Sequence, residues 1–199
     1  MVVLGQTIEN CKGLFLNRNL GGGFSSLVHH LAALGNKRIG FVGGETGIRQ
    51  TTARLVAYRD ALKSLGLEYN EELIELSDYY HKDGYDAMKR LLDKDISKPD
   101  AVVAINDAVA IGAIRAINDA GMSCPQDIAI VSGDQFFESN YITPRLTSLD
   151  QQNDYLGRLA IMTLISAING NTDPVSIEHS PRLIIRESCG SQIRREFDS

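Results

Sequence analysis

The sequence has few cysteines and no tryptophan. Its three cysteines, Cys11, Cys124 and Cys189, are odd in number and widely spaced. This pattern fits neither a disulfide framework nor a zinc site. We therefore expect a protein of a reducing compartment, and the cytoplasm is the simplest location.

Long apolar runs and dense positive charge are also missing. No apolar run approaches the length of a membrane span, and the first residues, MVVLGQTIENCK, show none of the three parts of a secretion signal. Twenty Lys and Arg residues face twenty-five Asp and Glu residues, which gives a net charge of −5. Without a long apolar run, we expect no membrane contact. Because no basic cluster is dense enough to neutralise a run of phosphates, we also expect that this chain alone does not bind DNA.

The signatures of common enzyme and cofactor sites are absent as well. The stretch GGETG at residues 43–47 lacks both the dinucleotide spacing and the Lys-Ser/Thr pair of a phosphate loop. Ser132 is not embedded in a G-x-S-x-G motif, and the histidines have no companions at metal-ligand spacing. The sequence thus predicts no catalytic residue, no metal and no cofactor.

What is present is a regular alternation of strand and helix patterns. The 199 residues, 43% of them apolar, are enough for one large domain or two small ones. From residue 36 on, short apolar runs alternate with segments of helical period, which predicts parallel βαβ units in a doubly wound α/β sheet. The expected strands cover residues 38–42, 73–76, 101–105, 127–131 and 146–149, and the expected helices cover residues 50–65, 83–92 and 108–120.

The two ends of the chain do not follow this alternation of strands and helices. Strand-like pieces at residues 2–4 and 13–16 have no helix between them, and a last strand is expected at residues 183–185. Helices are expected at residues 22–34 and 154–168. These flanks indicate parts of a second, incomplete lobe.

Distinctive polar residues follow the predicted strands. Arg54 lies near the start of the helix after the first strand, Asn106 and Asp107 follow the third, and Asp134 follows the fourth. Tyr79 and its neighbour Tyr80 follow the second strand at the same rim and could form an aromatic wall. Ligands of open parallel sheets bind outside the carboxyl ends of the strands. A guanidinium, an amide and a carboxylate facing one cleft suit a polyhydroxylated ligand and imply no covalent chemistry.

Each of these residues also has a plain structural interpretation. Asn106 or Asp107 could simply cap the following helix. Arg54 could be a solvated helix residue paired with an acid, and Asp134 could form a turn. The shared location at one end of the predicted sheet favours a binding site.

The chain resembles the LacI/GalR family of bacterial transcription repressors over nearly its whole length. The resemblance rests on the runs HLAALGNKRIGFVGG (30–44), ARLVAYRDAL (53–62), PDAVVAINDAVAIGAIRAINDAG (99–121), PQDIAIVSGDQ (125–135), PRLTSLDQ (144–151) and PRLIIRES (181–188). Members join a helix-turn-helix headpiece to a core of two lobes similar to periplasmic sugar-binding proteins. Three crossovers link the lobes, and a small effector, usually a sugar or a nucleobase, binds between them.

The resemblance implies a set of effector-binding residues. The effector-contacting arginine of the family falls on Arg54, its cleft aromatic on Tyr79, its cleft asparagine on Asn106 and its aspartate on Asp134. Its hinge glutamine falls on Gln151, and Asn19 is a further candidate contact. The chain departs from the family pattern at Asn36, Ala57, Ser132, Gly133 and Gln135, which affects the identity of the effector more than the fold.

The resemblance also implies a division of the chain. Residue 2 already matches a late strand of the amino-terminal lobe, so the headpiece and the first part of that lobe have no counterpart. We expect a remnant of that lobe and a crossover helix at residues 1–35 and a complete carboxy-terminal lobe at 36–149. A hinge crossover with a helix follows at 150–175, and a return strand with a tail at 176–199. Leu156, Ala160 and Leu164 should then expose an apolar face.

The functional hypothesis is a sugar-sensing core without enzymatic activity. The effector would close the lobes about Gln151 and shift the population between two states of a homodimer, which meets operator DNA only through the absent headpiece. The helix at 108–120 would be either fully buried or part of the dimer contact. The alternatives are the periplasmic sugar-binding component of a transporter and, with less support, an α/β enzyme that uses a nucleotide.

Overall fold

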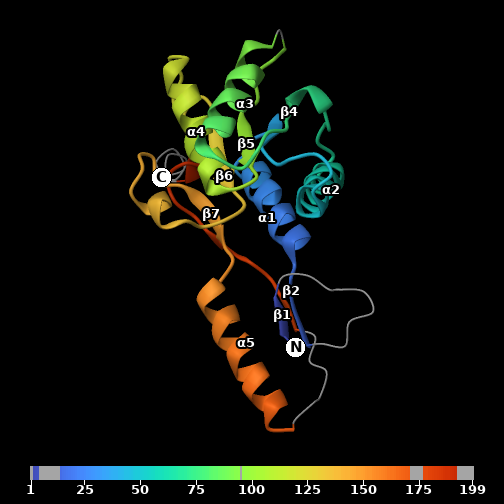
Figure 1. Cartoon of the computed structure of the whole chain (residues 1–199). Helices are drawn as coiled ribbons and strands as arrows, with labels where there is room; N and C mark the ends of the chain where they lie inside the picture. The colour runs from blue at the N-terminus through green and yellow to red at the C-terminus, as the bar shows by residue number, and fades with distance from the viewer. Residues whose placement is uncertain (1, 5–13, 95, 171–176, 192–199) are drawn as a thin grey trace, which may run out of the picture.

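The computed structural model describes residues 2–4, 14–94, 96–170 and 177–191. Its strands form one sheet of six strands and one of three. The larger sheet and its helices make a lobe, and the smaller sheet extends from one end of it together with helix α5 (Asn153–Ile168) (Figure 1). The chain passes between the two parts three times.

The six-stranded sheet has the order β4-β3-β5-β6-β7-β9. Its strands are β3 (Ile39–Val42), β4 (Ile74–Glu75), β5 (Ala101–Ala104), β6 (Ala129–Ser132), β7 (Thr147–Asp150) and β9 (Arg182–Ile184). All neighbours pair in parallel except β7 and β9, which are antiparallel. β3, β5 and β6 are buried along their whole length, as apolar strands covered on both faces should be. The doubly wound α/β sheet is therefore confirmed.

Helices cover both faces of this sheet. On one face α1 (Leu20–Ala33) packs against α2 (Arg49–Ser64), and on the other α3 (His81–Asp93) packs against α4 (Asp107–Asp119) (Figure 1). Two short 3-10 helices, η1 (Glu71–Leu73) and η2 (Phe137–Asn140), lie in loops. η2 lies between β6 and β7, where the earlier parallel connections carry a full α-helix. The apolar residues of α4 are mostly buried inside the chain, which is one of the two arrangements expected.

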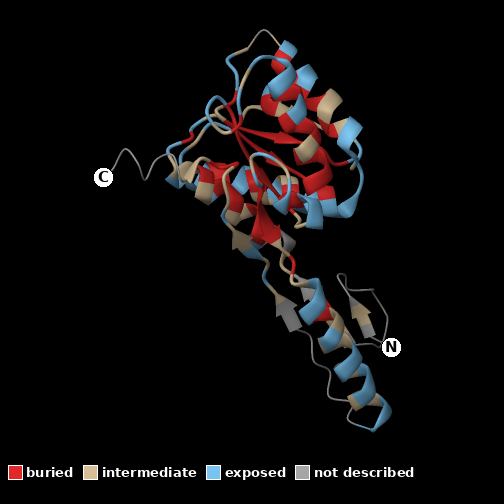
Figure 2. Cartoon of the chain, turned by 90° about the vertical axis from the view of Figure 1, so that its left-hand side faces the viewer, coloured by how far each residue is buried: buried red, intermediate tan, exposed pale blue. Residues whose placement is uncertain are grey.

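The smaller sheet consists of β1 (Val2–Leu4), β2 (Leu14–Arg18) and β8 (Ile177–His179), all parallel. α5 packs against β1 and β2. Most of α5 is exposed, in contrast to the buried core of the lobe (Figure 2). Its exposed apolar residues are Tyr155, Ile161, Met162, Leu164, Ile165 and Ile168.

The structure corrects one expectation for this helix. Leu156 was predicted to be exposed, but it is buried. α5 packs against β1 and β2, so this helix has a partner within the described chain. Leu164 is exposed as expected, and Ala160 is half-buried.

Every helix and strand predicted from the sequence is present, with ends displaced by at most two residues. Strand β8 was not predicted. Its three residues are too few to show an alternating pattern, and the strand depends on its pairing with β2, more than 150 residues earlier in the chain.

Two glycines allow α3 and α4 to approach closely. A Cβ atom on Gly84 would lie 2.2 Å from the Val109 carbonyl oxygen, and one on Gly112 would lie 1.9 Å from the His81 carbonyl oxygen. Neither backbone can retreat without separating the helices. Glycine is therefore required at both positions of this contact.

We expect Gly112→Ala to lower the free energy of unfolding by about 3 kcal/mol or more, because it forces two packed helices apart. Gly157→Ala is a matched control, since Gly157 also lies within a helix but, its own helix backbone and chain neighbours aside, no described atom lies within 4 Å of its ideal Cβ position. It should stabilise the chain by about 0.5–1 kcal/mol through helix propensity. Urea unfolding measures both variants, and equal effects would contradict this account of the α3–α4 contact.

Candidate binding site

Five of the six predicted site residues come from elements that meet at one edge of the large sheet. Tyr79, Asn106, Asp134 and Gln151 lie at or just beyond the carboxyl ends of β4, β5, β6 and β7, and Arg54 lies on α2, which follows β3. Because these strands are parallel, their carboxyl ends share one edge. We call these five residues the rim cluster.

Arg54 is at the centre of the rim cluster. Its side chain is buried, with Nη1 donating to the Ile105 carbonyl at 2.7 Å and Nη2 donating to Asp134 Oδ1 at 3.3 Å. The guanidinium carbon lies 4.9 Å from the ring centre of Phe24 on α1. A cation in this position is attracted to the face of the ring. One side chain thus joins α2, the end of β5 and the loop after β6.

Asp134 and Gln151 form the second part of the cluster. Gln151 Nε2 donates to the Gly133 carbonyl at 2.8 Å and to Asp134 Oδ1 at 3.3 Å. The Asp134 carboxylate therefore lies between the guanidinium of Arg54 and the amide of Gln151, and its side chain is 25% exposed. It can accept further hydrogen bonds from a molecule at the rim.

Two buried polar atoms of the cluster lack a partner. Within the described residues, neither Arg54 Nε nor Gln151 Oε1 makes a hydrogen bond. An unpaired buried polar group costs about 1–3 kcal/mol, so such atoms call for an explanation. One is a donor and the other an acceptor, as a ligand with hydroxyl groups would require.

Asn106 and Tyr79 lie together beside this centre. Asn106 Oδ1 accepts from the Val109 N–H at 2.9 Å and caps α4, while Nδ2 donates to the Tyr79 carbonyl at 2.9 Å. The Tyr79 hydroxyl is 2.7 Å from Thr51 Oγ1 on α2. The cap predicted as the plain alternative for Asn106 is therefore present, and its amide also fixes the backbone at Tyr79.

The remaining candidates are less closely tied to the cluster. Asn19 caps α1 by accepting from the Gly22 N–H at 2.7 Å. Within the described residues it has no hydrogen bond to the rim cluster. Tyr80 is 72% exposed at the start of α3, so it is accessible but not packed into a wall.

Phe24 was not predicted as part of the site. It is completely buried, and a Cβ atom on Gly133 would lie 2.4 Å from its ring. Phe24 therefore supports the site from beneath rather than presenting a stacking surface. Its sequence signal is that of an ordinary apolar helix residue, so only the contact with Arg54 reveals the role.

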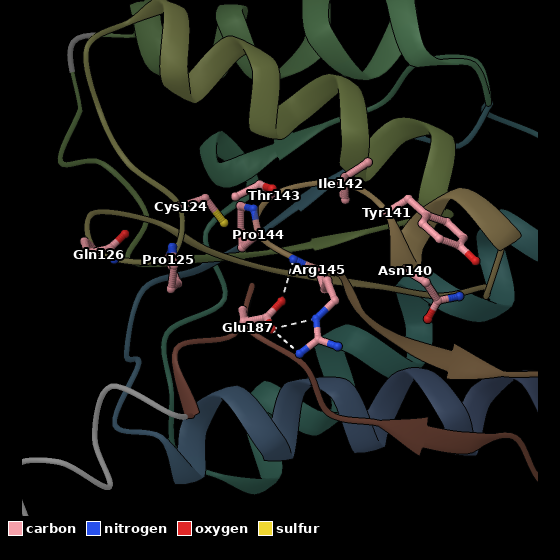
Figure 3. A pocket seen from close by; sticks show the side chains of 10 residues that line it. All are labelled: Cys124, Pro125, Gln126, Asn140, Tyr141, Ile142, Thr143, Pro144, Arg145 and Glu187. Atoms are coloured by element: carbon pink, nitrogen blue, oxygen red, sulfur yellow. Dashed lines mark hydrogen bonds and ion pairs between the residues drawn. The ribbon is translucent and has the colours of Figure 1, made fainter.

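A hollow in the described part of the chain is lined by residues outside the rim cluster. It has a volume of about 680 Å³ and is lined by residues 124–126, residues 140–145 and Glu187 (Figure 3). Arg145 Nε donates to Glu187 at 2.7 Å, and this contact lowers the pKa of the Glu187 carboxyl. Burial raises the pKa of the Cys124 thiol to about 12, which leaves it protonated and unreactive at neutral pH. The hollow contains none of the predicted site residues.

Neither a metal site nor a spanning segment is found in the described residues. No group of three or more His, Cys, Asp or Glu residues there could hold a metal ion. None of the helices in that part of the chain has the length and apolar character needed to cross a bilayer.

Comparison with known proteins gives a consistent result. Residues 28–189 match the family model of the periplasmic binding protein-like domain. The regulator CelR of Thermobifida fusca is 33% identical over 171 residues, which are 85% of this chain and 50% of CelR. The repressor PurR of Pasteurella multocida is 33% identical over 160 residues, which are 80% of this chain and 48% of PurR. The chain thus spans about half the length of these relatives.

Solved structures agree with this result. A complex of the regulator CelR with cellobiose has a TM-score of 0.84 and 29% identity, covering 94% of this chain and 58% of CelR. A LacI-family regulator from Enterococcus faecium with bound ribose has a TM-score of 0.82 and 25% identity, covering 94% of this chain and 69% of the regulator.

We expect Arg54 and Asp134 to be energetically coupled. A double-mutant cycle of Arg54→Gln and Asp134→Asn in urea unfolding should give a coupling of about 1 kcal/mol or more, because both groups are largely removed from water. The control pair is Arg115 and Asp119, one helical turn apart on α4 and 72% and 38% exposed. Its coupling should be about 0.3–0.5 kcal/mol. A coupling for Arg54 and Asp134 no larger than the control would show that the rim cluster is not held by this pair.

Proposed function

Since the chain belongs to the periplasmic binding protein-like family, and within it to the LacI/GalR transcription regulators, we propose that it is the effector-binding core of such a regulator, with a sugar as the effector. The observation that carries this proposal is the meeting of Arg54, Asp134 and Gln151 at the carboxyl edge of the large sheet. No covalent chemistry is required of these groups, and we propose no enzymatic activity.

The charge of the site favours a neutral ligand. Arg54 contributes one positive charge and Asp134 one negative charge, so the pair is neutral overall. A phosphate ester would meet the Asp134 carboxylate, and a cation would meet the Arg54 guanidinium. Neighbouring hydroxyl groups can instead donate to Asp134 and accept from Arg54. A sugar satisfies both groups without adding charge.

The connections between the two sheets support closure on the ligand. Gln151 lies at the crossover from β7 to α5, and the next residue, Gln152, has φ of 51°. It is the only non-glycine residue of the described chain in the left-handed region, which costs about 1 kcal/mol or more. The Gln152 N–H donates to Asp150 Oδ1 at 2.7 Å. Backbone strain next to the buried Gln151 of the rim cluster fits a hinge at which sugar binding shifts the population of lobe positions.

The proposed division of the chain follows from this arrangement. Residues 36–149 form the lobe that carries most of the rim cluster. Residues 1–35 supply a remnant of the partner lobe and a crossover helix, residues 150–175 the hinge and its helix, and residues 176–199 the return strand and tail. The assembly that we predict from this division is a cytoplasmic homodimer. It would bind an operator through a headpiece outside this sequence.

We predict that a sugar binds at the rim cluster of the 199-residue chain. Saturation-transfer difference NMR, which detects millimolar binding, should give a signal for at least one of cellobiose, ribose and glucose, and a weaker one or none for inosine. Asp134→Asn should weaken binding by roughly tenfold or more, because a hydrogen bond to a charged group is lost. Glu187→Gln, in the hollow of Figure 3, is the control and should leave affinity unchanged. No sugar signal, or equal losses in both variants, would contradict the proposal.

The sequence of the gene upstream of Met1 distinguishes regulation from transport. A regulator requires an encoded helix-turn-helix segment followed by the first part of the amino-terminal lobe. A periplasmic transport component would instead encode a secretion signal. The relatives favour the first outcome, since they are regulators by name. A secretion signal in that position would overturn the assignment.

A further inference from the structure

The next residue after Asn106 is a fully buried carboxylate that the rim cluster does not include. Asp107 is the first residue of α4 and has no exposed surface. Its Oδ1 accepts from the Ser132 hydroxyl, and its Oδ2 accepts from the Ser139 hydroxyl and, at 2.8 Å, from the Phe136 N–H. Three donors from one short stretch of chain therefore point at a single side chain.

These donors flank Asp134 on both sides. Ser132 precedes it by two residues, and Ser132 Oγ also lies 3.5 Å from the Asp134 N–H as an acceptor. Phe136 and Ser139 follow Asp134. Asp107 thus contacts the stretch before and the stretch after the residue whose carboxylate faces Arg54.

This stretch has little other regular structure to hold it. The connection from β6 to β7 contains only the short helix η2, where the neighbouring parallel connections contain α-helices. Two aromatic side chains on it point outward, with Phe136 41% and Phe137 74% exposed. They give the loop little anchorage in the core.

Burying a carboxylate in this position has a cost that an apolar residue would avoid. Desolvation raises the pKa of Asp107, and the hydrogen bonds from Ser132, Ser139 and Phe136 oppose that shift. A buried, fully hydrogen-bonded ion is often no more stabilising than apolar residues of the same volume. Its presence is better explained by the geometry that it imposes on the loop.

We propose that Asp107 is a positioning residue for the effector site, which holds residues 133–139 so that the Asp134 carboxylate stays between Arg54 and Gln151. This proposal rests on the proposed function in one respect, which is that Asp134 contacts the effector. It names no contact between Asp107 and the effector, because Asp107 is completely buried.

The absence of tryptophan from the chain provides a clean reporter of the loop. Phe137→Trp puts a single indole on η2, at a side chain that is already 74% exposed. Its fluorescence anisotropy and its quenching by acrylamide report the mobility of residues 133–139. Neither measurement needs a sugar.

In this Phe137→Trp background we expect Asp107→Ala to lower the anisotropy and to abolish the coupling between Arg54 and Asp134. Asp107→Asn should restore both readouts, because its carbonyl can still accept from the Phe136 N–H while its amide donates to the Ser132 oxygen. A role of Asp107 in general stability alone predicts no such rescue of the loop. If Asp107→Ala does not fold, Ser139→Ala removes one of the three bonds and should give the same changes at smaller amplitude.

Ser188→Ala is the matched control. Ser188 is as buried as Ser139, its hydroxyl donates to the Ile130 carbonyl and accepts from the Thr147 N–H, and within the described residues it makes no hydrogen bond to η2. It should destabilise the chain and leave both loop readouts unchanged. Unchanged anisotropy and coupling in Asp107→Ala, or equal changes in Ser188→Ala, would overturn the proposal.

Sugar titration of the same variants separates this proposal from the proposed function. We expect Asp107→Ala to weaken sugar binding by roughly tenfold or more, as Asp134→Asn does, and Asp107→Asn to recover most of it. If no sugar binds the parent chain but the loop readouts respond as expected, the proposed function fails and the positioning role stands. If sugar binds the parent and Asp107→Ala equally well, the positioning role fails and the proposed function stands.

Discussion

The candidate site depends on one buried guanidinium. Arg54 leaves α2, reaches the carbonyl at the end of β5, and meets a carboxylate on the loop after β6. Each of these elements is placed by the parallel sheet, and Arg54 joins them through its hydrogen bonds. In surroundings of low polarity its charge needs both the Asp134 carboxylate and the Phe24 ring, so removal of either leaves a buried cation poorly compensated. Because the Arg54 charge needs these partners, a ligand would have to replace or extend the contacts of Arg54 at this edge of the sheet.

The large sheet and the rim cluster together explain why the residues are far apart in the sequence. Parallel strands place their carboxyl ends at one edge, and the loops there diverge because helices leave toward opposite faces. The smaller sheet and α5 adjoin this edge through three chain connections, one of which contains the strained Gln152. Apolar residues along α5 remain exposed, whereas those of the lobe are buried. A site at the junction of these two parts fits the closure proposed above.

Much of the fold could be predicted because its signals are local. The runs at β3, β5 and β6 are apolar throughout since helices cover both faces, and the glycines that follow α2 and α4 end those helices in the left-handed region. The predicted convergence of Arg54, Asn106 and Asp134 follows from the same strand pattern and from the family resemblance. Strand β8 could not be predicted, because it depends on its pairing with β2, and the burial of Leu156 depends on tertiary packing of α5; neither leaves a local pattern. Phe24 was missed because an apolar helix residue is common without any function. Asp107 was noted with Asn106 after β5, but its burial and its bonds to the loop after β6 leave no trace in the sequence.

The most direct test follows the two side chains of the rim cluster that carry the unpaired atoms. The side-chain resonances of Arg54 Nε–Hε and of the Gln151 amide can be followed by two-dimensional NMR while a binding sugar is added. We expect both resonances to shift in a saturable manner, with the same dissociation constant, while the side-chain resonance of Arg145 in the hollow of Figure 3 does not move. Saturable shifts at Arg145 with none at Arg54 and Gln151 would contradict this expectation and would place the ligand in the hollow instead.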